Sequence, residues 1–223
     1  MKNKLILVRL AAFLIDINIS AAILLFFFMR LAAAIDITTF LDRLLSLIIA
    51  LLFIFPLVLP FVRLICMSKF GGTVGKLLSG LEIEDFTTKK RISFWQAFFR
   101  EYAGYTISGL FFGLGFFWIF KDKDQRGWHD HLANTKVVVK NTGGLLVGAA
   151  ALIVLVIING LSVKYIFDSA TQNLTLYSGW VSDINDAMKN MKRENSEKIF
   201  PGASAVTSPI LQPPSRPVVK ATP

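Results

Sequence analysis

The stretch of sequence that decides the fold is residues 5–29, LILVRLAAFLIDINISAAILLFFFM. It is long and apolar enough to cross a bilayer, because about 20 apolar residues in a helix span the hydrocarbon core. Arg9 and Asp16 interrupt the stretch seven positions apart, which places both on one side of a helix. Ala12 lies between them, and Ser20 follows. Since a carboxylate at membrane depth normally faces protein or water, the pattern predicts a polar seam inside a membrane protein.

The composition also indicates a membrane protein. Of the 223 residues, 54% are hydrophobic, 20 are phenylalanine and only 17% are charged, and the mean hydropathy is +0.57. The net charge is +9, but lysine and arginine stand at the ends of apolar runs, where they orient the chain and meet anionic lipid. We therefore expect a lipid bilayer as partner and no nucleic acid. The first run is too long for a cleaved signal peptide, and Asp16 interrupts it, so we interpret it as a retained span.

Further apolar runs follow. The run at 44–65 is a second span, in which Pro56 and Pro60 predict a kink. The run at 103–120 is rich in glycine and has basic residues on both sides, which favours a re-entrant hairpin turning within 109–115 over a full third span. The run at 143–158 is a plain span without charges. The hairpin places the C-terminal tail outside the cytoplasm, and the full span places it inside.

The polar segments complete the predicted fold. Residues 69–91 are basic and are expected in the cytoplasm, where the alternating stretches 81–84 and 136–140 form a small two-stranded sheet. We predict an all-α membrane protein with three to four hydrophobic helical segments, one of them re-entrant in the favoured topology, and this small sheet. Its parts are a membrane domain at 1–140, a further transmembrane helix at 141–167, an amphipathic helix at 168–200 and a proline-rich disordered tail at 201–223.

Several short motifs suggest chemistry that their details do not support. The segment around Gly72, Gly75 and Lys76 resembles a phosphate-binding loop, but it lacks the first glycine and the hydroxyl residue after the lysine. His129, Asp130 and His131 have zinc-ligating side chains, but no further histidine exists and nothing fixes their geometry. No nucleophile–base set is apparent. We therefore expect no enzyme activity, no metal and no cofactor, and we expect Arg126 and Asp130 to make buried polar contacts.

The order of these motifs resembles the RDD family of bacterial membrane proteins. The resemblance rests on residues 9–16 (RLAAFLID), 72–81 (GTVGKLLSGL), 94–100 (FWQAFFR) and 126–135 (RGWHDHLANT), and it covers roughly residues 5–140. It implies that Arg9, Asp16 and Asp130 are the charged residues that characterise the family. The supporting motif residues are then Gly72, Gly75, Lys76, Arg100, Asp124, Arg126, Gly127 and His129. Val74 stands where the family usually has proline, and Asn134 where it often has glycine.

The resemblance implies a transport role, because some members of that family look like sodium–proton antiporters. We expect a multi-pass protein of the bacterial inner membrane with a cytoplasmic N-terminus. Asp16 would be the site of Na+ or H+, Arg9 its charge partner, and Asp130 with His129 the cytoplasmic mouth. A homo-oligomer is expected because so few helices enclose little volume. The alternative is a membrane scaffold or assembly factor, whose buried charges are structural and whose C-terminal tail binds a protein partner.

Overall fold

Three long apolar helices dominate the computed structural model, which describes residues 2–199. The first is α1 (Lys2–Ala32). The second runs over Ile37–Phe70 and consists of α2 (Ile37–Ile49), the π-helical η1 (Ala50–Val58) and α3 (Leu59–Phe70). The third is α9 (Gly144–Gln172). All three are long and apolar enough to cross a membrane, which confirms the predicted class of fold.

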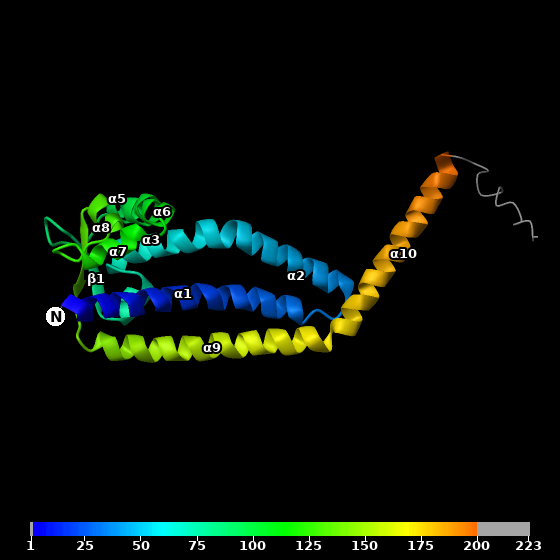
Figure 1. Cartoon of the computed structure of the whole chain (residues 1–223), viewed down its shortest axis with the longest axis horizontal. Coiled ribbons are helices and arrows are strands. Elements are labelled where there is room, and N and C mark those ends of the chain that lie inside the picture. The colour runs from blue at the N-terminus through cyan, green and yellow to red at the C-terminus, as the bar shows by residue number, and fades with distance from the viewer. Residues whose placement is uncertain (1, 200–223) are drawn as a thin grey trace, which may run out of the picture. The chain divides into compact units, whose positions relative to one another are not determined.

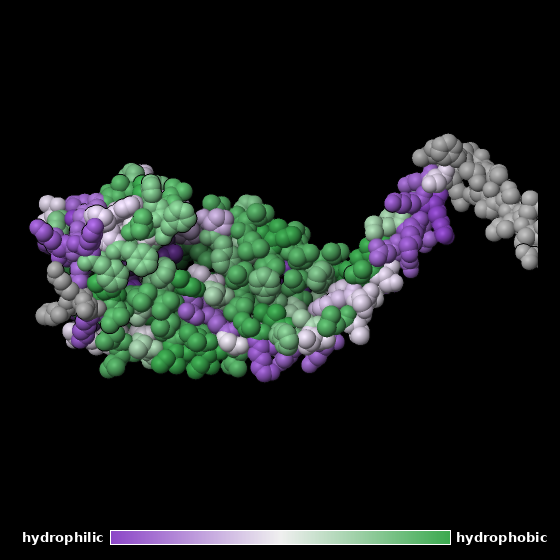
Figure 2. Space-filling view, viewed as in Figure 1, coloured by the Kyte–Doolittle hydropathy of each residue, from purple (hydrophilic) through white to green (hydrophobic). Residues whose placement is uncertain are grey.

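The three long helices lie side by side, with α1 next to α9, and the short elements gather at the end where α1 begins (Figure 1). Hydrophobic side chains cover the visible flanks of these helices, and hydrophilic ones gather at the end that holds the short elements (Figure 2). An apolar exterior of this kind is stable against lipid and not against water, so the long helices form the lipid-facing part of the protein.

The predicted kink in the second span takes the form of the π-helical turn η1, which contains Pro56. Proline lacks a backbone N–H, and a π-helical stretch accommodates the missing hydrogen bond by widening the turn. Pro60 follows directly after the π-helical turn, within the same continuous helix, and its missing N–H removes a second helical hydrogen bond at this point. The second span is therefore bent by its own sequence.

The glycine-rich run forms a bent pair of helical segments. These are Phe94–Leu110 and Leu114–Phe120, which meet at an angle of 105°. The bend lies within the predicted turn at 109–115, where Phe112 has a φ of 52° and Gly113 a φ of 79°. Ser93 caps the first segment, because its side chain accepts a hydrogen bond from the Gln96 backbone N–H at 3.2 Å. The shorter elements within this pair are α5 (Phe94–Phe98), η2 (Phe99–Gly104), α6 (Tyr105–Leu110), α7 (Leu114–Phe117) and η3 (Trp118–Phe120).

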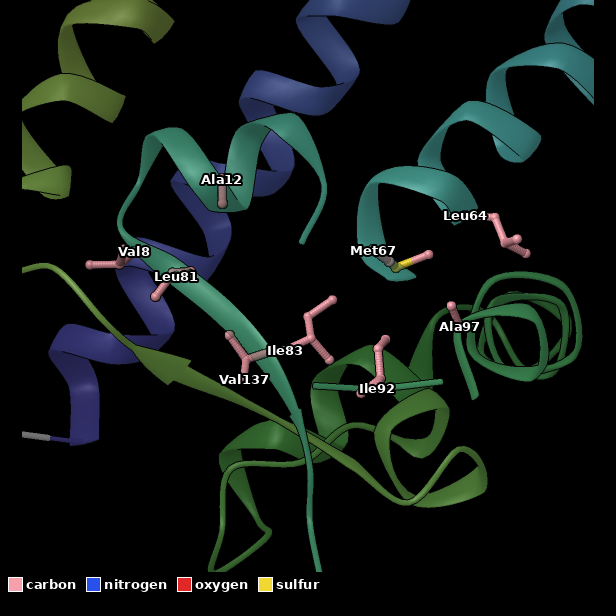
Figure 3. Packing of buried hydrophobic residues seen from close by; sticks show 9 residues of the cluster. All are labelled: Val8, Ala12, Leu64, Met67, Leu81, Ile83, Ile92, Ala97 and Val137. Atoms are coloured by element: carbon pink, nitrogen blue, oxygen red, sulfur yellow. The ribbon is translucent and has the colours of Figure 1, made fainter. Parts of the chain in front are cut away.

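The predicted two-stranded sheet is present. Strand β1 (Leu81–Asp85) pairs antiparallel with β2 (Thr135–Val139), and Ile83 lies opposite Val137. Both of these side chains are buried, together with apolar residues from α1, α3 and α5 (Figure 3). The complete cluster is Val8, Ala12, Leu64, Met67, Leu81, Ile83, Ile92, Ala97 and Val137. This core joins the start of the first helix to the end of the second and thereby fixes the polar loops around them.

Close contacts fasten α9 to the rest of the first unit. Gly144 and Gly148 pack on the turn at Ser79 and Gly80, where an added Cβ on either α9 glycine would overlap with the turn. Further along the helix, the Asn159 side chain donates to the Asn18 Oδ1 atom at 2.9 Å. The helix α9 is therefore held by small residues against the turn at Ser79 and Gly80 and by an amide pair against α1, two kinds of contact that are common between helices in lipid.

The second unit, from Leu174 onward, is described by itself. Its helix α10 (Leu174–Ile199) begins after a break at Asn173 and lies within the stretch 168–200 predicted to be amphipathic, of which residues 168–172 belong to α9 instead. Val181, Ile184, Met188 and Met191 are exposed along it. The tail predicted at 201–223 lies outside the described residues.

Candidate functional site

A buried carboxylate, that of Asp130, joins three distant parts of the chain. Asp130 lies in the first turn of the short helix α8 (Trp128–Leu132) and is fully buried. Its Oδ2 atom accepts hydrogen bonds from Arg9 Nη2 at 2.8 Å and from the Gly127 backbone N–H at 2.9 Å. Its Oδ1 atom accepts a hydrogen bond from Arg100. Because Arg9 lies on α1 and Arg100 on η2, one side chain ties both elements to the polar loop.

The surrounding charges keep Asp130 ionised. Burial alone would raise the pKa of this carboxyl, but the guanidinium groups of Arg100 and Arg9 lower it well below its ordinary value. Burial lowers the pKa of the neighbouring His129 to about 3, so its imidazole is neutral at physiological pH. His129 stacks on the Tyr105 ring with 4.9 Å between ring centroids. Asp130, Arg9 and Arg100 thus form a network of ion pairs that stays charged at neutral pH and does not exchange protons there. We call this network the Asp130 lock.

A third arginine, Arg126, binds next to the Asp130 lock by donating to backbone carbonyl oxygens. Arg126 Nε donates to the Thr135 carbonyl oxygen at 3.0 Å, and Arg126 Nη2 donates to the Asp130 carbonyl oxygen at 3.2 Å. The predicted buried polar contacts of Arg126 and Asp130 are therefore confirmed. Arg100 also donates to Thr135 Oγ1 at 2.5 Å, which links η2 to the first residue of β2.

Asp16 occupies a different environment, about 18 Å along α1 from Lys4, where the apolar span begins. Its Oδ2 atom accepts a hydrogen bond from Thr73 Oγ1 at 2.6 Å, and its Oδ1 atom accepts one from the Gly75 backbone N–H at 2.8 Å. Both donors are neutral. Within residues 2–199, no lysine or arginine forms an ion pair with Asp16 at 4.0 Å or less. The interpretation of Arg9 as its charge partner is wrong, because Arg9 pairs with Asp130.

The glycine-rich loop reaches Asp16 because Gly75 has no side chain. A Cβ atom at Gly75 would overlap with the Ala12 carbonyl group of α1 and come within 3.0 Å of the Asp16 carboxyl carbon. The loop then continues into the short helix α4 (Val74–Leu78), in which the buried Lys76 lies 3.4 Å from Thr73 Oγ1. The segment that resembles a phosphate-binding loop thus does bind an anion, and the anion is a carboxylate of the same chain.

Asp16 also borders a cavity of about 260 Å³ between α1 and the second span. Arg63 of α3 faces the same cavity and forms an ion pair with Glu101, with 3.2 Å between Nε and Oε1. The other lining residues are Phe13, Ile17, Ser20, Ala21, Leu24 and Phe55. An acidic and a basic group therefore share one largely apolar cavity at the level of the spans.

The remaining predicted site residues lie in three places. Gly127 and His129 lie at the Asp130 lock, where Gly127 donates its N–H and His129 packs beside the carboxylate. Asp124 lies apart from both carboxylates and pairs with Lys136 at 2.8 Å. Gly72 is buried next to the side chains of Lys76 and Leu77. Within residues 2–199, no group of three or more histidine, cysteine, aspartate or glutamate residues is arranged to hold a metal.

Sequence reasoning missed three polar residues around Asp16. Thr73 was part of a motif considered only for phosphate, although a hydroxyl beside two glycines is a common donor to a carboxylate. Arg63 resembled an ordinary basic residue near the end of a span, and Glu101 resembled a break in an apolar face. An arginine and a glutamate within two neighbouring apolar segments are a signal for such a pair.

The model of the RDD family matches residues 5–134, which include the lock, the glycine-rich loop and Asp16. The chain belongs to the RDD family. Over 77 residues it is 36% identical to the uncharacterized protein YxaI of Bacillus subtilis (strain 168), a match that covers 34% of this chain. The aligned part spans about half (49%) of the length of YxaI. No solved structure matches the chain. The three long apolar helices and the family together identify a multi-pass membrane protein.

Proposed function

We propose that this RDD protein carries a small cation or a proton across the bacterial cytoplasmic membrane, with Asp16 as the binding group. The observation that carries the proposal is the contrast between the surroundings of two carboxylates, Asp130 and Asp16. Asp130 is held by two arginines, whereas Asp16 has two neutral donors and borders a cavity. The buried Lys76 contacts Asp16 only through Thr73, whose Oγ1 atom lies 3.4 Å from its Nζ atom. A carboxylate whose direct hydrogen-bond donors are neutral is suited to bind an ion or a proton.

The direction of the protein in the membrane follows from its charges. Arg9 and the basic loops at 69–91 and 121–126 lie at the end of the bundle where α1 begins (Figure 1). The positive-inside rule assigns this end to the cytoplasm, so the N-terminus is cytoplasmic in our proposal. The long helices expose many large apolar side chains, and a cavity of about 260 Å³ does not cross a bilayer by itself. We therefore include a homo-oligomer in the proposal.

The proposal is tested with purified protein in vesicles that contain a pH-sensitive dye. Pulses of NaCl, LiCl or KCl should drive proton movement in vesicles with the wild-type protein. Asp16→Asn should abolish the signal, because the amide keeps the shape but loses the charge that binds a cation. The matched control is Asp42→Asn, which makes the same change at an exposed position of α2 and should leave transport intact. An Asp16→Asn protein with wild-type flux would contradict the proposed role of this carboxylate.

The second candidate function is a membrane scaffold, and one observation favours it. The helix α10 exposes apolar residues that its own unit does not cover, such as Ile184 and Met188. In this case the charges at Asp130 hold the fold together, and α10 binds a partner protein. Replacing Ile184 and Met188 by serine should then remove the cellular function and leave purified protein stable. A carrier should retain its flux after the same change.

A further inference from the structure

A positively charged side chain also borders the cavity next to Asp16, and the proposed carrier function assigns it no role. Arg63 borders this cavity, and its side chain is 33% exposed. Its guanidinium lies 5.9 Å from the centre of the Tyr105 ring, within the range of a cation–π contact. Arginine cannot lose its proton in a protein, so this positive charge is present in every state of the site.

Glu101 holds Arg63 by charge more than by hydrogen bonding. The Nε and Oε1 atoms lie 3.2 Å apart, yet neither Arg63 Nε nor Glu101 Oε2 has a hydrogen-bond partner among the described residues. The Glu101 side chain is only 7% exposed. Asp130, by contrast, receives several well-formed hydrogen bonds. Arg63 can therefore leave Glu101 without breaking a hydrogen bond of its Nε atom.

We propose that Arg63 is an internal cation that pairs alternately with Glu101 and Asp16. In one state Arg63 pairs with Glu101, and Asp16 binds the transported cation. In the other state Arg63 turns across the cavity to Asp16, the cation leaves, and Glu101 takes up a proton on its unpartnered Oε2 atom. The inference rests on the proposed carrier function and gives it a mechanism, in which one cation is exchanged for one proton.

Charge balance supports this exchange. Asp16, Glu101, Arg63 and the buried Lys76, which lies 3.4 Å from Thr73 Oγ1, sum to a net charge of zero when both carboxyl groups are ionised. One bound cation and one bound proton add the same charge, so exchanging one for the other leaves the charge of the site unchanged. Because Arg63 can pair closely with only one carboxylate at a time, the cation and the proton exclude each other. Glu101 is thus a positioning residue, since it acts on cation binding through Arg63.

The test separates binding of the cation from its coupling to protons. Glu101→Gln resembles a permanently protonated glutamate and should release Arg63 to Asp16. If Arg63 then occupies Asp16 about nine tenths of the time, the half-saturating cation concentration rises about tenfold. Proton movement driven by NaCl, LiCl or KCl should be lost. The double variant Arg63→Gln, Glu101→Gln removes the competitor, so binding of radioactive sodium returns to the wild-type range while proton coupling stays absent.

The controls make each outcome decisive. Glu82→Gln makes the same change in the small sheet, where Glu82 pairs with the exposed Arg91 and Lys140, and it should leave binding and coupling intact. A double variant that binds sodium no better than Glu101→Gln overturns the inference, as does coupled exchange that survives in Glu101→Gln. If Glu101→Gln is not monodisperse, the double variant is compared with wild type, and weaker sodium binding overturns the inference. A wild-type protein that carries none of the three cations would instead contradict the proposed function itself.

Discussion

Replacing Asp130 by asparagine removes the negative charge that pairs with both Arg9 and Arg100 at the polar end of the protein. The substitution keeps the size of the side chain but replaces one carboxylate oxygen by an NH2 group, which donates and cannot accept. Arg9 and Arg100, whose side chains are 10% and 0% exposed, then keep their charges without the carboxylate between them. An NH2 group facing Gly127 N–H or either guanidinium would also oppose donor to donor.

The expected loss of stability is large for a single substitution. Removing one partner of a buried ion pair destabilises a protein by about 3–5 kcal/mol, because the charge left behind has lost its compensation. For a protein of this length, that corresponds to a melting temperature lower by roughly 10 °C. The apolar core around Ile83 and Val137 is not touched by the change, so secondary structure should persist below the transition.

The measurement is the melting curve of purified protein in detergent, followed by intrinsic tryptophan fluorescence and by monodispersity in size-exclusion chromatography. Asp124→Asn is the matched control, because Asp124 lies in the same loop and forms an ion pair with Lys136. This pair is largely exposed, with side-chain exposures of 46% and 28%, so the control should lose less than about 1 kcal/mol. Equal melting temperatures for the two variants would refute the structural lock.

Three further predictions concern other parts of the fold. The pKa of His129 is about 3 when folded, below the ordinary value of 6.5, so the unfolded chain binds the proton first. Stability should therefore decrease as the pH falls below about 6.5, by about 1.4 kcal/mol per pH unit, and His129→Gln should flatten this slope in melting curves. Gly75→Ala should destabilise the protein by about 1–3 kcal/mol and weaken transport, because the new methyl group overlaps with α1 and displaces the loop from its carboxylate. Asn159→Leu should cost about 0.6–1.7 kcal/mol through the lost hydrogen bond to Asn18, measured by the same melting curves.

Each of these predictions has a comparison that can contradict it. A pH slope that is unchanged in His129→Gln would exclude this imidazole as its source. Gly109→Ala is the control for Gly75→Ala, because no atom lies within 4 Å of a Cβ at Gly109, and equal effects of both changes would refute the close-contact argument. An Asn159→Leu protein more stable than wild type would show that apolar packing between α1 and α9 outweighs the amide pair.

The fold was largely predictable because its signals are local. The apolar runs give the spans, Pro56 gives the distortion of the second one, and alternation in two short stretches gives the sheet. The sharp bend near Gly113 followed from basic residues on both sides of a short apolar run. These features depend on neighbouring residues, so a single sequence contains them. The use of a π-helical turn was not predictable, since it depends on how the second span packs.

The sequence identified Arg9, Asp16 and Asp130, but not their hydrogen-bond partners. The spacing of Arg9 and Asp16 shows that their side chains point to the same side of the first helix. Their partners, however, come from loops far along the chain. The partner of Arg9 lies 121 residues away, and the donors to Asp16 lie 57 and 59 residues away. Periodicity holds no information on such contacts. Arg63 and Glu101 were missed for the same reason, because each looks ordinary within its own segment.

The distance of 121 residues between Arg9 and Asp130 has a consequence for how the protein is made. At about 5–20 residues per second, a ribosome synthesises the carboxylate roughly 6–24 s after the arginine. During that interval the first helix holds a charge whose counterion does not yet exist. The first helix can therefore reach its final position only after the loop that contains Asp130 has emerged from the ribosome.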